Sequence, residues 1–500
     1  MKVLLFSLIL LLFWAQQSSA QQPGAVQWAN VDDLSPGFDT IHSMKVQTDG
    51  KIVTAGNSYD HSMYKRVMAV GRYVGAIPDL SFGSNGLVTT SLDSAHTVAK
   101  AVAIQTDGKI VVAGGSQKGT TGDFLVARYN PNGSPDSSFG INGVLQTDMD
   151  SGSFDGANAL AIRLDGKLVA AGWSGQSLAL CRYNTDGSLD SSFDVDGKLV
   201  VAASIATSMK LQANGKIVLC CGNMVVRLNP DGSLDTGFGA NGIVSLNYNF
   251  NDVALQNDGK ILLAGSPFVL QRLDTAGAID VSFGSSGTVM TSGFVYGASN
   301  PGQSATWVCV QTDGRILAGG WAKFCMLGDC RVFAVARYKP NGRPDSSFGN
   351  SGNSPSRMYG KATSNSASSF DRAATSYAAA ITANNDLIVA GSSADGTFDA
   401  SEGKWALASF YLGPPLSVQT VPVGDEQITV APNPSSGVIT FSAPSAIQRI
   451  VVTDLTGKVV YREQPGSLTT TIDLGGKATG VYFYEVESGS GKERGKLVIH

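Results

Sequence analysis

Short runs of β-branched and other apolar residues alternate with polar turns along most of the chain, and one hairpin pattern returns seven times. Its copies begin at Val46, Ile104, Ile162, Leu211, Leu255, Val310 and Ile381. In nearly every copy an Asp-Gly or Asn-Gly pair separates two apolar runs. Such a pair supplies the positive φ angles of a two-residue type I′ turn, which predicts a tight antiparallel hairpin. Successive copies lie 44 to 71 residues apart, the spacing of propeller blades or solenoid coils.

A second pattern follows six of the hairpins and adds two more strands to the repeat. It is clearest at 127–140 and 336–349, where Ala-Arg-Tyr is followed by Pro-Asn-Gly and then by Asp-Ser-Ser-Phe-Gly. A strand, a turn and a returning segment fit this pattern, and an apolar run after the Phe-Gly provides an outer strand. Four antiparallel strands per repeat, without helical periodicity, predict an all-β fold in the form of a seven-bladed β-propeller.

The two ends of the repeat region predict that the ring closes. Residues 26–39 match the second pattern but have no hairpin before them, whereas the last hairpin, at 381–391, is followed by no Ser-Phe-Gly segment. The N-terminal half-repeat can therefore supply the strand that the last blade lacks, and closure removes open sheet edges. These motifs resemble the delta-60 repeat, a β-propeller repeat of bacterial secreted proteins, over roughly residues 24–411.

In six repeats an arginine precedes an aspartate by seven or eight residues. The pairs are Arg72 with Asp79, Arg128 with Asp136, Arg182 with Asp190, Arg227 with Asp235, Arg272 with Asp280 and Arg337 with Asp345. Across the turn each pair could meet as a bidentate ion pair. Where the N-terminal half-repeat carries Gln27 instead of arginine, it also carries Ser35 instead of aspartate. We therefore interpret the pairs, and the phenylalanine after each aspartate, as structural rather than catalytic.

One face of the predicted propeller carries the irregular loops. The second loop of the blade is long after hairpins one, two, six and seven, at 57–65, 116–122, 321–331 and 392–404. These blades are neighbours in a closed ring, so we expect a crescent of loops that binds a polysaccharide, a peptide or a protein. The ligand-binding candidates are Tyr59, His61, Tyr64, Trp321 and Phe324, with Phe294, Tyr296 and Trp307 on the same side. The alternative is that these segments are tolerated insertions.

The sequence offers few catalytic groups. It has four histidines, none of them paired at metal-binding spacing, and it lacks a Gly-x-Ser-x-Gly elbow and a phosphate-binding glycine-rich loop. We therefore assign no catalytic residue and no cofactor. One acidic segment, with Asp148, Asp150 and Asp155, could hold calcium, and a solvated acidic loop is the alternative. Two loop carboxylates could also serve a carbohydrate hydrolase or lyase, and a structural adhesin is a third possibility.

Residues 1–20 have the layout of a secretory signal peptide, with an apolar run from Val3 to Trp14 and a cleavage site expected after Ala20. No later stretch has the length of a transmembrane segment. The net charge of −4, with 15% charged residues, indicates no nucleic-acid partner.

Four of the six cysteines lie in β-runs, where we expect buried thiols. Cys325 and Cys330 flank a short loop that a disulfide could close, and two free thiols are the alternative.

After a propeller at 21–412 and a linker at 413–427, a compact β-pattern at 428–500 predicts a small C-terminal β-sandwich. Its landmarks are Pro432, Asn433, Pro434, Gly437, Asp454, Gly457, Lys458 and Gly480. In this order they resemble the C-terminal type A sorting domain of the type IX secretion system of Bacteroidota. The resemblance implies that the secretion machinery is a partner and that the domain is removed after passage through the outer membrane. We therefore expect a secreted or surface-attached binding propeller.

Overall fold

The computed structural model describes residues 23, 25–32, 39–92, 95–150, 152–294, 302–323, 331–349, 361–363, 373–394, 403–413, 428–431, 435, 437–443, 445–455, 457–489 and 491–499. Every regular element among them is a β-strand, which confirms the predicted all-β fold. The chain divides into two compact units, residues 1–415 and 416–500, and this division falls inside the predicted linker. The predicted signal peptide lies outside the described residues.

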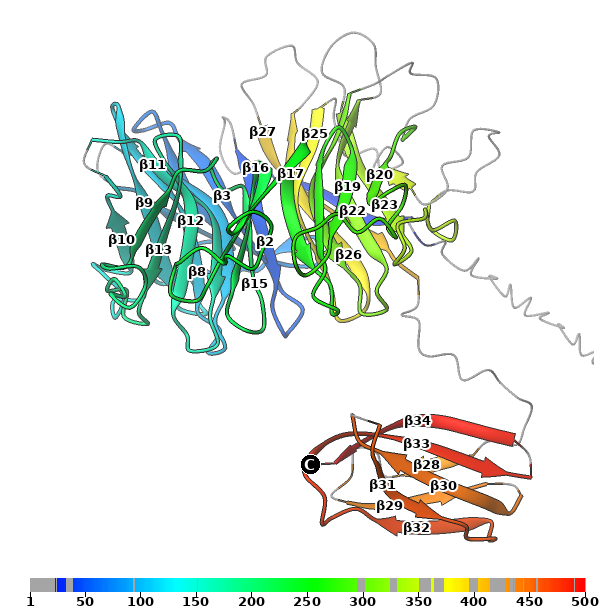
Figure 1. Cartoon of the computed structure of the whole chain (residues 1–500). Coiled ribbons are helices and arrows are strands. Elements are labelled where there is room, and N and C mark those ends of the chain that lie inside the picture. Colours follow the sequence, from blue (N-terminus) through cyan, green and yellow to red (C-terminus); the bar gives the residue numbers. More distant parts are fainter. Residues whose placement is uncertain are drawn as a thin grey trace, which may run out of the picture. The chain divides into compact units, whose positions relative to one another are not determined.

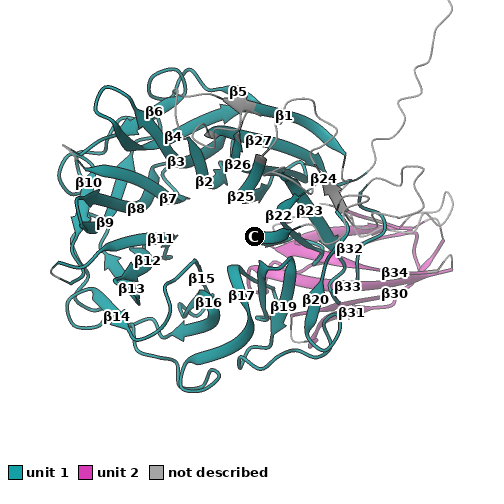
Figure 2. Cartoon of the chain, turned by 90° about the horizontal axis from the view of Figure 1, so that it is seen from above, with its two compact units in different colours: residues 1–415 teal, residues 416–500 magenta. Residues whose placement is uncertain are grey.

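The sheets of the first unit stand side by side around a ring, as Figures 1 and 2 show, and their first strands lie toward its middle. The first sheet contains β2 (Thr40–Val46), β3 (Ile52–Asp60), β4 (Lys65–Val74), β5 (Ile77–Pro78) and β6 (Leu87–Thr90). The second contains β7 (His96–Ile104), β8 (Ile110–Lys118), β9 (Thr121–Tyr129) and β10 (Val144–Thr147). The third contains β11 (Asp155–Ile162), β12 (Leu168–Ser174), β13 (Ser177–Tyr183) and β14 (Lys198–Val201).

Two larger sheets each combine two repeats. The six-stranded sheet contains β15 (Ser208–Leu211), β16 (Ile217–Leu228), β17 (Ile243–Leu255), β18 (Ile261–Ser266), β19 (Val269–Leu273) and β20 (Thr288–Met290). The eight-stranded sheet contains β21 (Gln303–Val310), β22 (Ile316–Lys323), β23 (Arg331–Tyr338), β24 (Lys361–Thr363), β25 (Ala373–Ile381), β26 (Asp386–Ala394), β27 (Gly403–Tyr411) and β1 (Val26–Asp32). Its two halves are joined by one parallel pair, Arg331 with Ala373. Counting one blade for each hairpin gives seven, which we infer from the strand pairing.

All seven predicted hairpins form, but their turns differ from the prediction. In the second copy the Gly108 N–H donates to Gln105 O at 2.9 Å and the Gln105 N–H donates to Lys109 O at 2.8 Å. The turn therefore has three residues, and of these only Gly108 has a positive φ, 82°. The predicted type I′ turn is wrong, because it would also require a positive φ at Asp107. The Asp107 carboxylate instead accepts the Lys109 N–H at 3.1 Å.

The N-terminal strand closes the ring. β1 pairs antiparallel with β27, from Val26 opposite Phe410 to Asp32 opposite Trp405. This pairing confirms that the N-terminal half-repeat completes the last blade. The last blade thereby gains its fourth strand from a segment more than three hundred residues away in sequence.

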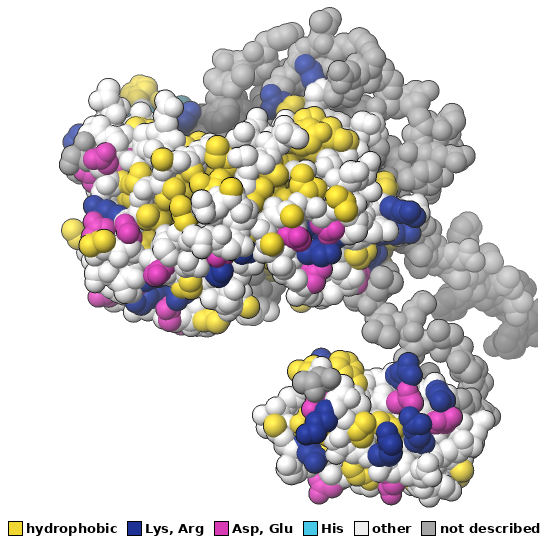
Figure 3. Space-filling view, in the orientation of Figure 1, with side chains coloured by type: hydrophobic (Ala, Val, Ile, Leu, Met, Phe, Trp, Pro, Cys, Tyr) yellow, Lys and Arg dark blue, Asp and Glu magenta, His cyan; other side chains and the backbone are white. Residues whose placement is uncertain are grey.

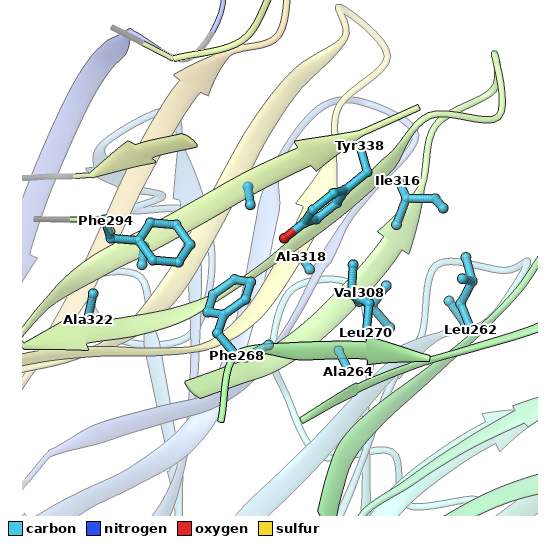
Figure 4. Packing of buried hydrophobic residues seen from close by; sticks show 14 of the residues in the cluster. Leu262, Ala264, Phe268, Leu270, Phe294, Val308, Ile316, Ala318, Ala322 and Tyr338 are labelled. Atoms are coloured by element: carbon cyan, nitrogen blue, oxygen red, sulfur yellow. The ribbon is translucent and has the colours of Figure 1, made fainter. Parts of the chain in front are cut away.

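The hydrophobic core of the propeller lies between adjacent blades. Figure 4 shows one such cluster, in which Phe268 and Leu270 of one repeat pack against Ala318 and Tyr338 of the next. Small alanines alternate with aromatic side chains, which lets the sheets pack closely. Apolar side chains also reach the surface of this unit, as the yellow atoms in Figure 3 show.

The second unit confirms the predicted β-sandwich. One sheet contains β28 (Thr429–Ala431), β29 (Val438–Ser442) and β32 (Thr469–Asp473), and the other contains β31 (Val459–Glu463), β30 (Ile447–Thr453), β33 (Gly480–Ser488) and β34 (Gly491–Ile499). Residues from both sheets, including Phe441 and Ile450, form one buried cluster. This unit has its own hydrophobic core.

Candidate functional site

The structure brings together all six predicted arginine–aspartate pairs, although not in the bidentate geometry that we expected. In the second repeat Arg128 Nε lies 2.6 Å from Asp136 Oδ2. The other guanidinium nitrogens donate to Thr185 O in the next repeat, at 2.5 Å, and to Ser138 Oγ, at 3.2 Å. The guanidinium carbon also lies 4.4 Å from the centre of the Phe139 ring. Arg128 therefore fastens its own blade to the following one, which is why only one of its nitrogens contacts the carboxylate.

A lysine from the hairpin turn completes this arrangement, and its role was missed in the sequence. Lys109 Nζ lies 3.0 Å from the same Asp136 oxygen that Arg128 contacts. Burial alone would raise the pKa of Asp136, but hydrogen bonds from Ser138, Lys109 and Arg128 hold it well below its usual range. The equivalent cations of the other five repeats contact their aspartates in the same way. The repeated charges therefore compensate one another within the scaffold.

A second repeated feature was not predicted, a β-bulge in six of the seven innermost strands. The bulged residues are His42, Lys100, Asn158, Asn251, Thr306 and Tyr377. Opposite each bulge stands a glycine, and a Cβ on it would lie 1.8 to 2.0 Å from a carbonyl oxygen of the bulged strand. The glycines are Gly56, Gly114, Gly172, Gly265, Gly320 and Gly391. In the fourth repeat this position holds Cys221, and the β15–β16 ladder ends at Ser208 without a bulge.

The bulge positions show where the repeats differ. In the third, fifth and sixth blades the bulged side chain is short and donates to the backbone of the next blade, as from Asn158 to Ala206 O at 2.8 Å and from Asn251 to Ala305 O at 2.8 Å. The seventh blade holds Tyr377, whose ring lies 5.7 Å from the His42 ring. In the first two blades the position holds His42 and Lys100, whose Nε2 and Nζ atoms lie 3.2 Å apart. Sites on repeat folds tend to lie where the repeat is broken. The different residue type at His42 and Lys100 was visible in the sequence, because each bulge position lies four residues before the start of its hairpin, at Val46 and Ile104.

A pocket of about 510 Å³ opens at these two positions. It is lined by residues of three consecutive blades, at the strand ends opposite the three-residue turns. Its lining includes the cations Arg66 and Lys100, the aromatic residues Tyr59, Phe154 and Trp173, and the amides Asn57 and Gln117. The volume is within the range of small-molecule sites.

Glycines let two aromatic rings of this lining lie against the backbone of a neighbouring strand. A Cβ on Gly156 would lie 2.5 Å from the Trp173 ring, and one on Gly122 would lie 2.9 Å from the Phe154 ring. Each ring therefore rests directly on the backbone of a neighbouring strand. This contact fixes the orientation of both rings without a ligand.

The pocket lining is positively charged. Burial, followed by the nearby charge of Lys100, lowers the pKa of His42 to about 3, so that the imidazole is neutral at neutral pH. Burial, followed by the charge of Arg66, lowers the pKa of Lys100 to about 8. Among the described residues, no carboxylate forms an ion pair with Arg66 or Lys100. The carboxylate that lines the pocket, on Asp155, already accepts hydrogen bonds from the Met149 N–H at 2.8 Å and from Ser153 Oγ.

The predicted ligand-binding residues are only partly brought together. Tyr59 lines the pocket, and the His61 ring lies 4.9 Å from its ring. Tyr64 is 77% exposed outside the lining. Trp321 lies in the sixth repeat, where the Arg331 guanidinium is 4.8 Å from its ring. Phe324, like Tyr296, Cys325 and Cys330, lies outside the described residues, and both Phe294 and Trp307 are buried.

Two of the predicted long loops are in fact extended hairpins. β3 and β4 continue to Asp60 and Lys65, which leaves a four-residue turn, and β8 and β9 continue to Lys118 and Thr121. Their polar residues resembled a loop in sequence because they lack apolar alternation. They are nevertheless paired strands, and they carry part of the pocket. The segments at 324–330 and 395–402 lie outside the described residues.

The acidic segment does not gather into a metal site in the part of the chain that the structure describes. Asp148 and Asp150 are exposed, whereas Asp155 is buried at the start of β11. The four cysteines that the structure describes, Cys181, Cys220, Cys221 and Cys309, are free thiols, and the first three are buried. The described residues include no helix that is long and apolar enough to cross a membrane.

In the second unit the described landmarks are turn positions. A Cβ on Gly437 would lie 2.4 Å from Gly475 Cα, and Gly437 has a φ of 121°. The Asp454 N–H donates to Lys458 O at 3.0 Å, and Gly457 between them has a φ of 83°. Gly480 begins β33. Pro432, Asn433 and Pro434 lie outside the described residues.

Family models match both units. A domain of unknown function (DUF5122) beta-propeller matches residues 105–139, 164–193, 212–238, 256–283 and 311–348. A secretion system C-terminal sorting domain matches residues 429–500. The chain carries DUF5122 β-propeller repeats and a type IX sorting domain. The sorting domain indicates handling by the type IX secretion machinery and export to the outer surface or the medium. No curated protein matches the chain in sequence.

The solved structures that this chain resembles are distant in sequence. PorZ, a surface component of the type IX secretion system of Porphyromonas gingivalis, is 13% identical with a TM-score of 0.39, and the match covers 92% of this chain and 59% of PorZ. YCF48 bound to D1 peptide is 10% identical with a TM-score of 0.44, and the match covers 79% of this chain and 100% of YCF48. A fungal alcohol oxidase of the AA5 family, in complex with copper, is 11% identical with a TM-score of 0.38. The match covers 96% of this chain and 98% of the oxidase.

Proposed function

We propose that the exported propeller is a binding protein whose extracellular ligand occupies the pocket between the first three blades. The observation that carries this proposal is the change at the bulge positions. Short side chains that donate to the next blade in the third, fifth and sixth blades are replaced by His42 and Lys100 where the pocket opens. Preoriented aromatic rings beside these groups provide the apolar surface and the polar contacts that small-molecule sites combine.

A binding role fits this lining better than paired-carboxylate catalysis. Hydrolysis of a glycosidic bond commonly uses two carboxyl groups on either side of the bond. The described lining contains one, Asp155, and its oxygens are already hydrogen-bonded. A structural adhesin is the second candidate, because apolar side chains such as Ile141 and Val195 are more than four-fifths exposed on the propeller surface.

A glycan and peptide array, probed with the full chain with and without calcium, tests the proposal. We expect saturable binding to one ligand class, weakened by Tyr59→Ala and by Trp173→Ala. Trp321→Ala is the matched control, because it removes an aromatic ring that the sequence also placed at the binding face but that lies outside the pocket. Binding that is lost in Trp321→Ala and retained in the other two variants would place the site in the sixth blade instead. Absence of saturable binding to every class would favour the adhesin.

A further inference from the structure

Two cations stand without a carboxylate partner in the pocket, in contrast to the cations of the scaffold. Every arginine and turn lysine of the six repeated clusters contacts an aspartate, at 2.5 to 3.5 Å. Arg66 and Lys100 have no such partner among the described residues. Arg66 is exposed, whereas Lys100 is half-buried. A charge that is partly removed from water is usually paired, so the unpaired Lys100 raises the free energy of the empty site. An anionic ligand would remove that cost.

The groups of the lining leave a net positive charge, because the cations Arg66 and Lys100 face one carboxylate in the described lining, that of Asp155. His42 is neutral at neutral pH and lies 3.2 Å from both Lys100 Nζ and Asn57 Oδ1. His96 Nδ1 accepts the Arg66 backbone N–H at 3.0 Å. Asp155 lines the pocket from the third blade, and its carboxylate accepts the Met149 N–H at 2.8 Å within its own loop.

The rest of the lining indicates the chemical class that carries the anion. Tyr59, Phe154 and Trp173 give flat apolar surfaces, and Asn57 and Gln117 offer amide groups that both donate and accept hydrogen bonds. A sugar ring presents an apolar face together with hydroxyl groups that need such partners. We propose that the pocket binds an acidic saccharide, a sugar that carries a carboxylate or a sulfate, with Arg66 and Lys100 as the residues that select its charge.

This inference rests on the proposed binding function, so its test compares two ligands that differ only in charge. Binding of an oligogalacturonate and of its methyl ester to the full chain is measured by isothermal titration calorimetry. We expect the acid to bind at least about tenfold more tightly than the ester. We also expect Arg66→Gln and Lys100→Gln each to weaken binding of the acid about tenfold or more and to leave that of the ester nearly unchanged. Lys118→Gln is the control, since Lys118 is exposed on the second blade outside the pocket.

The pH dependence gives a second readout. Lys100 loses its proton as the pH rises through about 8, so affinity for the acid should fall between pH 7 and 9 in the unmodified chain but not in Lys100→Gln. Equal affinity for acid and ester would overturn the charge selection and leave the binding proposal intact. Tight binding of the acid by both pocket variants would overturn the assigned residues. Binding of an acidic glutamate peptide but of neither an oligogalacturonate nor a sulfated saccharide would overturn the saccharide class. Failure of every array ligand to bind would overturn both proposals.

Discussion

Replacing Gly114 by alanine tests whether the bulges require glycine on the facing strand. A Cβ at this position would lie 1.8 Å from Val98 O, so the carbonyl must move by roughly 1 Å or more to restore normal contact. Such a shift strains the packed sheet, at about 1–3 kcal/mol, and weakens ladder hydrogen bonds worth about 1 kcal/mol each. We therefore expect Gly114→Ala to lower the free energy of unfolding by about 3–5 kcal/mol.

The adjacent glycine provides the matched control. At Gly115 the nearest atoms to a Cβ lie 3.7 Å away, which is ordinary contact, and its φ is not positive. Both substitutions restrict the unfolded chain by about the same 0.4–1 kcal/mol, so their difference reports the folded state. Guanidinium unfolding followed by tryptophan fluorescence measures the propeller alone, because no tryptophan occurs in residues 416–500. Equal stability of the two variants would refute the steric argument.

Three further predictions concern the scaffold and the sorting domain. Because the pKa of Asp136 is lower in the folded than in the unfolded chain, its stabilisation is complete above about pH 5 and is lost as the pH falls. Unfolding free energy should therefore decline less steeply from pH 5 to 3 in Asp136→Asn, and equal slopes would contradict this. Burial raises the pKa of Cys181 and Cys220 to about 12, so Ellman's reagent should modify them at pH 8 only after unfolding, with peptide mapping to locate any earlier reaction. Gly437→Ala should destabilise the sandwich, because the added Cβ would collide with Gly475. We expect residues 429–500 to become protease-sensitive while the tryptophan fluorescence of the propeller stays unchanged. Full protease resistance of the variant would show that the contact can relax.

The features that the sequence predicted correctly are local or repeated. Asp-Gly and Asn-Gly pairs marked six of the seven hairpins, because turn chemistry acts over a few residues. The half-repeat at 26–39 revealed ring closure because the missing strand of the last blade had the same pattern as the extra one. The joint change at Gln27 and Ser35 indicated that the arginine and aspartate meet.

The features that the sequence did not reveal depend on a partner strand. A bulge inserts one residue into one strand, and the alternation of apolar residues over so short a run does not show it. A glycine at the position of Gly114 occurs in every hairpin but one. The sequence does not show why glycine is required there, because the cause is the close carbonyl oxygen of Val98 on the facing strand. Similarly, Asn57 and Tyr59 resembled a loop because their environment is the pocket rather than the core. The proposed pocket therefore lies on the face where the sequence predicted a binding site, but it includes only some of the predicted blades.

The pairing of β1 with β27 places the two ends of the propeller sequence in the same blade. Removing residues 26–32 or residues 403–411 would expose an edge on the same sheet, although the deletions lie at opposite ends of the repeat region. The β1–β27 contact spans nearly the whole propeller sequence, and loop-closure entropy makes such contacts slow to form. The ring can therefore close only when both the N-terminal half-repeat and the final repeat are present. Until then the chain is an open array whose edge strands need protection from one another.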